Sequence, residues 1–113
     1  MKRYHLGEFE ELVLLTVGIL DQEAYGVSVL EEIKAQTGRK VNISAVHTVL
    51  NRLEDKGLLT SKMGGATEER GGRRKRLFVL SSAGRLALED VRNMRNKLFD
   101  QLPPFALDFS NGY

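Results

Sequence analysis

The stretch SAVHTVLNRLEDKG, residues 44–57, constrains the fold more than any other part of the chain. Its apolar residues recur at positions i, i+3, i+4 and i+7, which places them on one face of a helix. They are Val46, Val49, Leu50 and Leu53. Ser44 is a suitable N-cap, and Gly57 stands where a glycine commonly ends a helix. The stretch therefore predicts an amphipathic helix with one buried face.

Two further helices are expected before this segment. The first spans residues 7–20, and its apolarity is nearly continuous after the first turn, which predicts that its second half is buried on most sides. The second spans residues 25–36 and is followed by Gly38, a typical C-terminal glycine. The connector of residues 37–43 is longer than the turn of about three or four residues in a strict helix-turn-helix.

A hairpin and a fourth helix are expected after it. LLTSKM (58–63) and RLFVL (76–80) are strand-like runs separated by GGATEERGGRRK, which predicts a β-hairpin with a long tip. The last helix is expected to start at a Ser82 cap and to cover residues 83–101, before the proline pair at 103–104.

This order of elements predicts a mainly α fold with a small β-hairpin, namely a winged helix-turn-helix with one long helix added. A length of 113 residues suits one domain with an appended helix. The predicted parts are a winged helix domain over residues 1–81, a long C-terminal helix over 82–102 and a tail over 103–113.

Positive charge is concentrated in the tip of the predicted hairpin, called the wing. The net charge of the chain is +2, yet residues 70–76 carry five positive charges, so the rest of the chain carries −3. A local basic cluster is typical of a polyanionic partner, although a solvated loop would have the same composition. The wing residues expected to bind DNA phosphates are Arg70, Arg73, Arg74, Lys75 and Arg76.

The third helix is equipped to read DNA bases on its polar face. At about 100° per residue, that face lies opposite the apolar stripe. Asn can pair with adenine and Arg with guanine or phosphate, and the N-terminal half of a recognition helix normally meets the base edges. The candidate DNA-binding residues of this helix are Ser44, Ala45, His47, Thr48, Asn51 and Arg52. Helix and wing together predict a DNA-binding domain at residues 1–81.

The last helix carries an apolar stripe close to a coiled-coil period, which predicts a homodimer on a palindromic site. The candidate dimerisation residues are Ala87, Val91, Met94, Leu98 and Leu102. Packing of the same stripe onto its own domain is the alternative, and the apolar first helix could share in the interface.

Several segments in order also resemble the PadR family of bacterial transcriptional regulators. They are the AYG of Ala24, Tyr25 and Gly26, the LxRLExKGL stretch over residues 50–58, the GGRxxK wing and the helix start at residues 81–84. The resemblance covers about residues 4–90. It implies a winged-helix DNA-binding domain with a dimerisation helix, usually a repressor, and a small-molecule effector whose identity the sequence does not indicate.

Catalytic and metal-binding patterns are missing from the sequence. The chain has no cysteine, and His5 and His47 stand apart without a metal-ligand spacing. No paired carboxylates or nucleophile motif stands out, so neither an enzyme nor a cofactor is expected.

The N-terminal segment does not resemble a signal peptide, and the longest apolar run, residues 12–20, is too short for a membrane span. A cytoplasmic protein without a membrane partner is therefore expected. The alternative function is a nucleic-acid-binding or protein-interaction adaptor that uses the same basic wing without regulating transcription.

Overall fold

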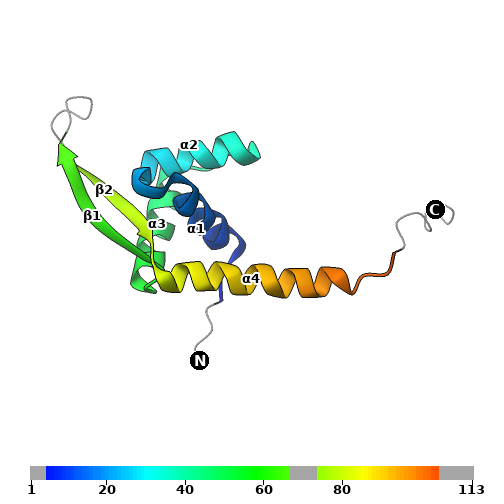
Figure 1. The fold of residues 1–113 in the computed structure, drawn as a ribbon. Helices are drawn as coiled ribbons and strands as arrows, with labels where there is room; N and C mark the ends of the chain where they lie inside the picture. Colours follow the sequence, from blue (N-terminus) through cyan, green and yellow to red (C-terminus); the bar gives the residue numbers. More distant parts are fainter. Residues whose placement is uncertain (1–4, 67–73, 105–113) are drawn as a thin grey trace.

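In the computed structural model, which describes residues 5–66 and 74–104, three helices lead into a two-stranded hairpin and a long fourth helix (Figure 1). The helices are α1 (Glu8–Leu20), α2 (Gly26–Thr37), α3 (Ile43–Asp55) and α4 (Ser82–Asp100), with a 3-10 turn at Asp21–Glu23. The strands are β1 (Leu59–Ala66) and β2 (Arg74–Leu80). This order confirms the predicted fold class.

The apolar stripe of α3 lies at the centre of the core. All four of its predicted members are buried, together with residues of α1, α2 and the hairpin. The largest fully buried side chains are Leu14, Ile33, Leu50, Leu53, Leu58 and Leu59. Each such side chain contributes about 1.5–3 kcal/mol by leaving water. The one-sided burial of α3 is therefore what holds it against α1 and α2.

Glycines end the second and third helices, as predicted. Gly38 has a φ of 70° and its N–H donates to the carbonyl of Lys34, while Gly57 follows α3 with a φ of 79°. A left-handed backbone is accessible to glycine without a steric penalty from Cβ.

The predicted N-caps of α3 and α4 are wrong by one or two residues. Asn42 caps α3, because its Oδ1 accepts from the N–H of Ala45 at 2.8 Å, and Ser44 lies in the first turn. Ser81 rather than Ser82 caps α4. Its Oγ accepts from the N–H of Gly84 at 3.0 Å and donates to the carbonyl of Gly57 at 2.7 Å. That second bond, which a serine one residue later does not make, joins the end of α3 to the start of α4.

The prediction that the second half of α1 is buried on most sides is also wrong. Val13, Leu14 and Val17 are fully buried, but Leu15 is 43% and Ile19 59% exposed. α1 packs against α2, α3, β2 and α4, yet these two side chains stay partly open to solvent. The near-continuous apolarity of α1 therefore leaves an apolar surface in water.

The hairpin is antiparallel, with Leu59 opposite Leu80 and Met63 opposite Arg76 before an irregularity near its far end. Both strands extend further toward the tip than predicted, and residues 67–73 lie outside the described part. The N–H of Phe78 donates to the carbonyl of Ala24 at 2.8 Å. This bond fixes β2 against the segment between α1 and α2, so the hairpin has a defined position relative to the helices.

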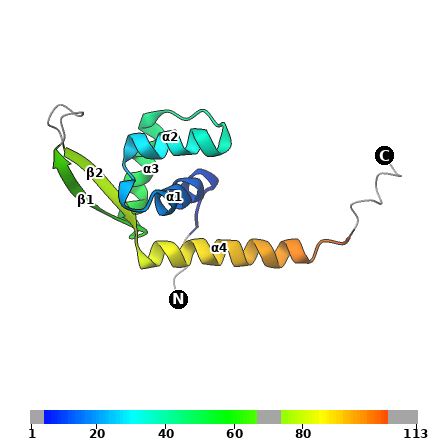
Figure 2. The same ribbon diagram turned by 45° about the horizontal axis from the view of Figure 1, so that its top comes forward.

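The two halves of α4 have different surroundings. Gly84 and Ala87 are buried near the base of the hairpin, whereas every described residue from Arg92 onward is exposed. The second half projects beyond the other helices (Figure 2). Ala87, which the sequence assigns to the dimer seam, packs in the core of its own chain, since the first half of α4 lies against the domain. No helix within residues 5–66 and 74–104 combines the length and apolarity needed to cross a membrane.

Candidate nucleic-acid interface

The polar face of α3 is open to solvent, as the helical geometry predicts. Its exposed residues are Ser44, His47, Thr48, Asn51, Arg52 and Asp55, and Ala45 is half-buried. The buried stripe on the opposite side fixes the rotation of the helix about its axis. The helix therefore keeps this face turned toward solvent.

The described wing cations Arg74, Lys75 and Arg76 lie on β2, and Arg76 lies near the exposed face of α3. Arg74 Nε donates to the carbonyl of Gly64 at 3.0 Å, and Arg76 Nη1 donates to Ser61 Oγ at 2.7 Å. Lys75 Nζ lies 4.4 Å from the centre of the Tyr25 ring, a cation–π contact. Two predicted wing residues, Arg70 and Arg73, lie outside the described residues.

One hollow brings α3 and the wing together. Its volume is about 310 Å³, and it is lined by Tyr25, Gly26, Val27, His47, Asn51, Arg76 and Phe78. The start of α2, the middle of α3 and β2 thus meet at one place. Two predicted base-reading residues, His47 and Asn51, share it with one predicted phosphate-binding residue, Arg76. A ligand that touches one group can touch the others.

Two consecutive hydrogen bonds connect the Arg76 guanidinium to α3. Ser61 Oγ, which accepts from Arg76, itself donates to Glu54 Oε2 at 2.5 Å. These bonds run from β2 through β1 to the last turn of α3. They lower the freedom of the Arg76 guanidinium and link its position to that of α3.

Gly26 belongs to the same site, although the sequence assigned it no binding role. A Cβ at this position would lie well inside van der Waals contact with the ring of His47. The glycine therefore lets the imidazole pack against the start of α2. The AYG segment, whose Tyr25 and Gly26 both line the hollow, carried the signal that could have revealed these residues.

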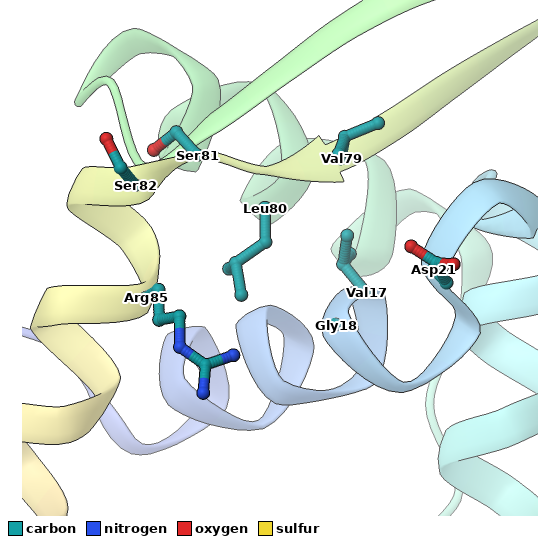
Figure 3. A pocket seen from close by; sticks show the side chains of 8 residues that line it. All are labelled: Val17, Gly18, Asp21, Val79, Leu80, Ser81, Ser82 and Arg85. Atoms are coloured by element: carbon teal, nitrogen blue, oxygen red, sulfur yellow. The ribbon is translucent and has the colours of Figure 1, made fainter.

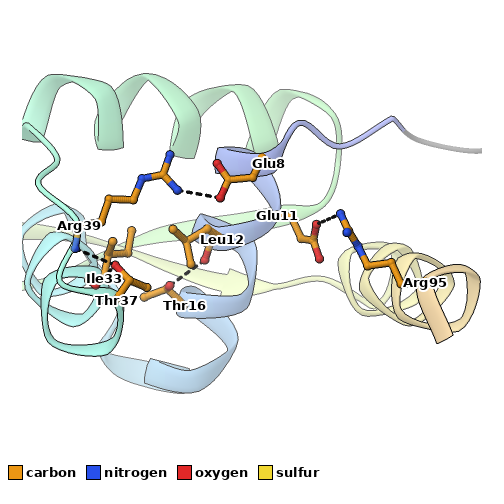
Figure 4. Close-up of polar contacts among 8 residues, drawn as sticks. All are labelled: Glu8, Glu11, Leu12, Thr16, Ile33, Thr37, Arg39 and Arg95. Carbon is orange, nitrogen blue, oxygen red and sulfur yellow. Dashed lines mark hydrogen bonds and ion pairs between the residues drawn. The ribbon is translucent and has the colours of Figure 1, made fainter. Parts of the chain in front are cut away.

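Three acidic residues in the first turn of α1, called the acidic turn, bind cations from three other elements. Glu8 Oε2 accepts from Arg39 after α2 at 2.7 Å, and Glu11 Oε1 accepts from Arg95 of α4 at 3.0 Å (Figure 4). The third, Glu10, faces α3. These partners lie 31, 46 and 84 residues away along the chain, so no local sequence pattern identifies them.

Glu10 holds two cations from α3 and its C-cap. Its carboxylate is 2.9 Å from Lys56 Nζ and 3.8 Å from Arg52 Nη1, and its Oε1 accepts from the N–H of Gly7 at 2.9 Å. Burial opposes its charged form, but the bonds from Gly7 and Lys56 and the charges of Lys56 and Arg52 hold its pKa below the usual value. Arg52, a predicted DNA-binding residue, is thus engaged by α1, although its side chain is still 52% exposed.

Two other hollows lie beside α1 and α4. The first, about 280 Å³, is lined by Val17, Gly18, Asp21, Val79, Leu80, Ser81, Ser82 and Arg85. Figure 3 shows the Arg85 side chain reaching from α4 toward α1 across it. The second, about 410 Å³, is lined by Leu15, Leu80 and Leu88 together with Arg85, Arg92 and Arg95 among its charged residues. Both combine apolar side chains with arginines. Within the described residues, no cluster of metal-ligating side chains occurs.

A family model described as the transcriptional regulator PadR-like family matches residues 14–90. No curated protein sequence matches the chain.

Several solved structures share the fold. A PadR-like transcription factor from Bacteroides fragilis is 20% identical, with a TM-score of 0.68 over 81% of this chain and 84% of that one. A PadR family transcriptional regulator from Eggerthella lenta is 24% identical, with a TM-score of 0.64 over 82% and 80%. Bacillus subtilis PadR, solved in complex with operator DNA, is 19% identical, with a TM-score of 0.62 over 73% of this chain and 46% of that one.

Proposed function

Because the chain belongs to the transcriptional regulator PadR-like family, we propose that it binds duplex DNA sequence-specifically as a homodimer and represses transcription from a palindromic operator. The observation that carries the proposal is the hollow where His47 and Asn51 of α3 meet Arg76 of β2. Base-reading and phosphate-binding groups need this proximity to contact one stretch of duplex together.

The proposed division of labour follows from side-chain chemistry. The polar face of α3, from its first turn to its middle, enters the major groove, where Asn51 pairs with a base and Ser44, His47 and Thr48 contact bases or phosphates. Arg74 and Arg76 neutralise phosphates beside the groove and release counterions. Ala45, half-buried, contributes a small apolar contact. We propose phosphate binding for Lys75, Arg70 and Arg73 as well.

The homodimer is supported by apolar surface that one copy leaves in water. The exposed large apolar residues of α4 and the residues just after it are Leu86, Met94, Leu98, Phe99 and Leu102, each 48–70% exposed. Met94 and Leu98 lie one turn apart on one face of α4, and exposed apolar surface is typical of interaction sites. The half-buried Val91 belongs to the same stripe, and Leu15 and Ile19 of α1 extend the apolar surface.

Release by a small effector completes the proposal. The hollow between α1 and α4 supports it, because Leu15, Leu80 and Leu88 offer apolar contact. Arg85 and Arg95 pair there with Glu89 and Glu11, which also line the hollow, so Arg92 supplies its net positive charge. A ligand there would touch both the domain that carries α3 and the helix proposed to join two copies.

The test is a selection of bound sequences from random duplex DNA, followed by filter binding with the selected duplex, single strands and RNA. Enrichment of a palindrome and preference for duplex are expected. Equal binding to single strands or RNA would contradict the proposal and favour the adaptor.

A further inference from the structure

Glu10 is the one buried ionisable side chain within residues 5–66 and 74–104. Its residue is 7% exposed, although glutamate is rarely buried without a strong reason. Taking a carboxylate out of water is costly unless cations and hydrogen bonds replace the water. The partners that replace it here come from α3, the proposed recognition helix, and its C-cap.

The Glu10 carboxylate has partners in two different elements. Oε1 accepts from the N–H of Gly7, which closes the first turn of α1. Both oxygens accept from Lys56 Nζ, at 3.2 and 2.9 Å, and Oε2 lies 3.8 Å from Arg52 Nη1. One carboxylate therefore binds the start of α1 and the end of α3 at once.

Arg52 follows Asn51 directly, on the same exposed face of α3. An unrestrained guanidinium at that place could reach a DNA phosphate on any sequence, because phosphate contacts carry no sequence information. Its attraction to the Glu10 carboxylate competes with such a contact. The affinity for DNA of arbitrary sequence is then lower than it would be if every surface cation, Arg52 included, could bind a phosphate.

We propose that Glu10 is a positioning residue of the DNA interface, which fixes the end of α3 against α1 and withholds Arg52 from phosphates. The inference rests on the proposed function. Glu10 thereby favours discrimination between DNA sequences. It keeps α3 in one orientation, and it removes one cation from sequence-independent binding. Lys56 serves as the anchor of this arrangement, since its ammonium lies closest to Glu10 and also donates to the carbonyl of His5 at 3.4 Å.

The test compares Glu10→Gln with the wild type on a short duplex of arbitrary sequence over a series of salt concentrations. Freeing Arg52 adds about one phosphate contact, so the slope of log K against log[salt] steepens by about 0.9. Affinity near 0.1 M salt rises about five- to tenfold. The double variant Glu10→Gln/Arg52→Ala loses this gain.

Glu11→Gln is the matched control, because it removes the same charge from the neighbouring residue, whose partner is Arg95 on α4. It is expected to leave the slope unchanged. An equal change in both variants, or a gain that persists without Arg52, would overturn the proposal and indicate a general effect of net charge.

Arg52→Ala alone tests the inference without disturbing Glu10. It is expected to change affinity for the arbitrary duplex less than about twofold, whereas Arg74→Ala weakens it about fivefold. Equal losses in the two variants would overturn the withholding of Arg52. A wild-type protein that binds no duplex at all would instead refute the proposed function, and this inference with it.

Discussion

α3 and α4 are both amphipathic, but they leave opposite faces uncovered. Every member of the apolar stripe of α3 is buried in the chain itself, and its polar face is exposed. α4 buries Ala87 near its start, while Met94, Leu98 and Phe99 remain in water. One helix therefore offers hydrogen-bonding groups, and the other offers apolar surface.

The difference indicates which kind of partner each helix suits. A fully covered apolar face leaves α3 nothing to gain from a second apolar surface, so its free side chains are available to a polar partner such as DNA. The apolar side chains in the second half of α4 leave water only when another apolar surface covers them, and that burial lowers the free energy. Substitutions on the covered and uncovered faces of the two helices test this contrast.

The most direct test is the same truncation in both helices. Leu53→Ala creates a cavity in the core, so the free energy of unfolding falls by about 2–5 kcal/mol. Leu98→Ala, measured where the chain is monomeric, changes it by less than about 0.5 kcal/mol because the side chain is already in water. Denaturant unfolding measures both. Similar losses would show that the two stripes are covered alike.

A charge on the free face of α4 tests what covers it. Leu98→Glu is expected to give monomers by sedimentation and to weaken operator binding at least about tenfold, since each copy then binds only one half-site. Asn93→Glu adds the same charge at another exposed position of α4 and is the control. An unchanged oligomeric state in Leu98→Glu would remove this face from the interface.

Truncation on the free face of α3 should change preference between sequences. Asn51→Ala is expected to lower discrimination at one or two base pairs by about 1–3 kcal/mol. Competition binding with single-base variants of the selected site measures it. Asp55→Ala, on the same face but one turn later, should leave the preference intact. A uniform loss over all sequences in Asn51→Ala would contradict its assignment.

The hairpin should contribute affinity without preference. Arg74→Ala is expected to weaken every duplex alike and to reduce the salt slope by about 0.9. Arg85→Ala removes the same charge from exposed α4 and serves as the comparison. A sequence-dependent loss in Arg74→Ala would move this residue from phosphate binding to base reading.

Acid should loosen the contact between α1 and α3 by a small amount. Because the pKa of Glu10 is lowered in the folded chain, its contribution to stability is present above the ordinary value of 4.5 and is lost as pH falls through the folded pKa. The free energy of unfolding of Glu10→Gln should therefore fall less between about pH 5 and pH 3 than that of the wild type. Parallel curves would contradict this.

The features that the sequence predicted correctly depend on local spacing. The stripe of α3, its exposed polar face and the two glycine stops each follow from residues within a few turns of one another. The hairpin was predicted for the same reason. Such signals are readable because periodicity and backbone preference act along the chain.

What could not be predicted depends on contacts between distant residues. Ser81, the cap of α4, also donates to the carbonyl of Gly57, 24 positions earlier, and no local pattern reveals that bond. Ala87 lies in the core of its own chain, and an apolar stripe alone cannot distinguish such packing from a dimer seam. Glu10 is 46 residues from Lys56 and 42 residues from Arg52, so no pattern of neighbouring residues predicts that its carboxylate pairs with both cations.

The close packing of Gly84 on the carbonyl of Leu58 has a consequence for operator architecture. With no room for a Cβ, the first turn of α4 packs directly on the backbone at the base of the hairpin, where the N–H of Ser81 also donates to the carbonyl of Leu58. This contact helps to set the direction in which α4 leaves the hairpin. If two copies join through α4, that direction sets the distance between the two α3 helices along the duplex. The number of base pairs between half-sites would then be encoded at this junction, and not in the residues that touch bases.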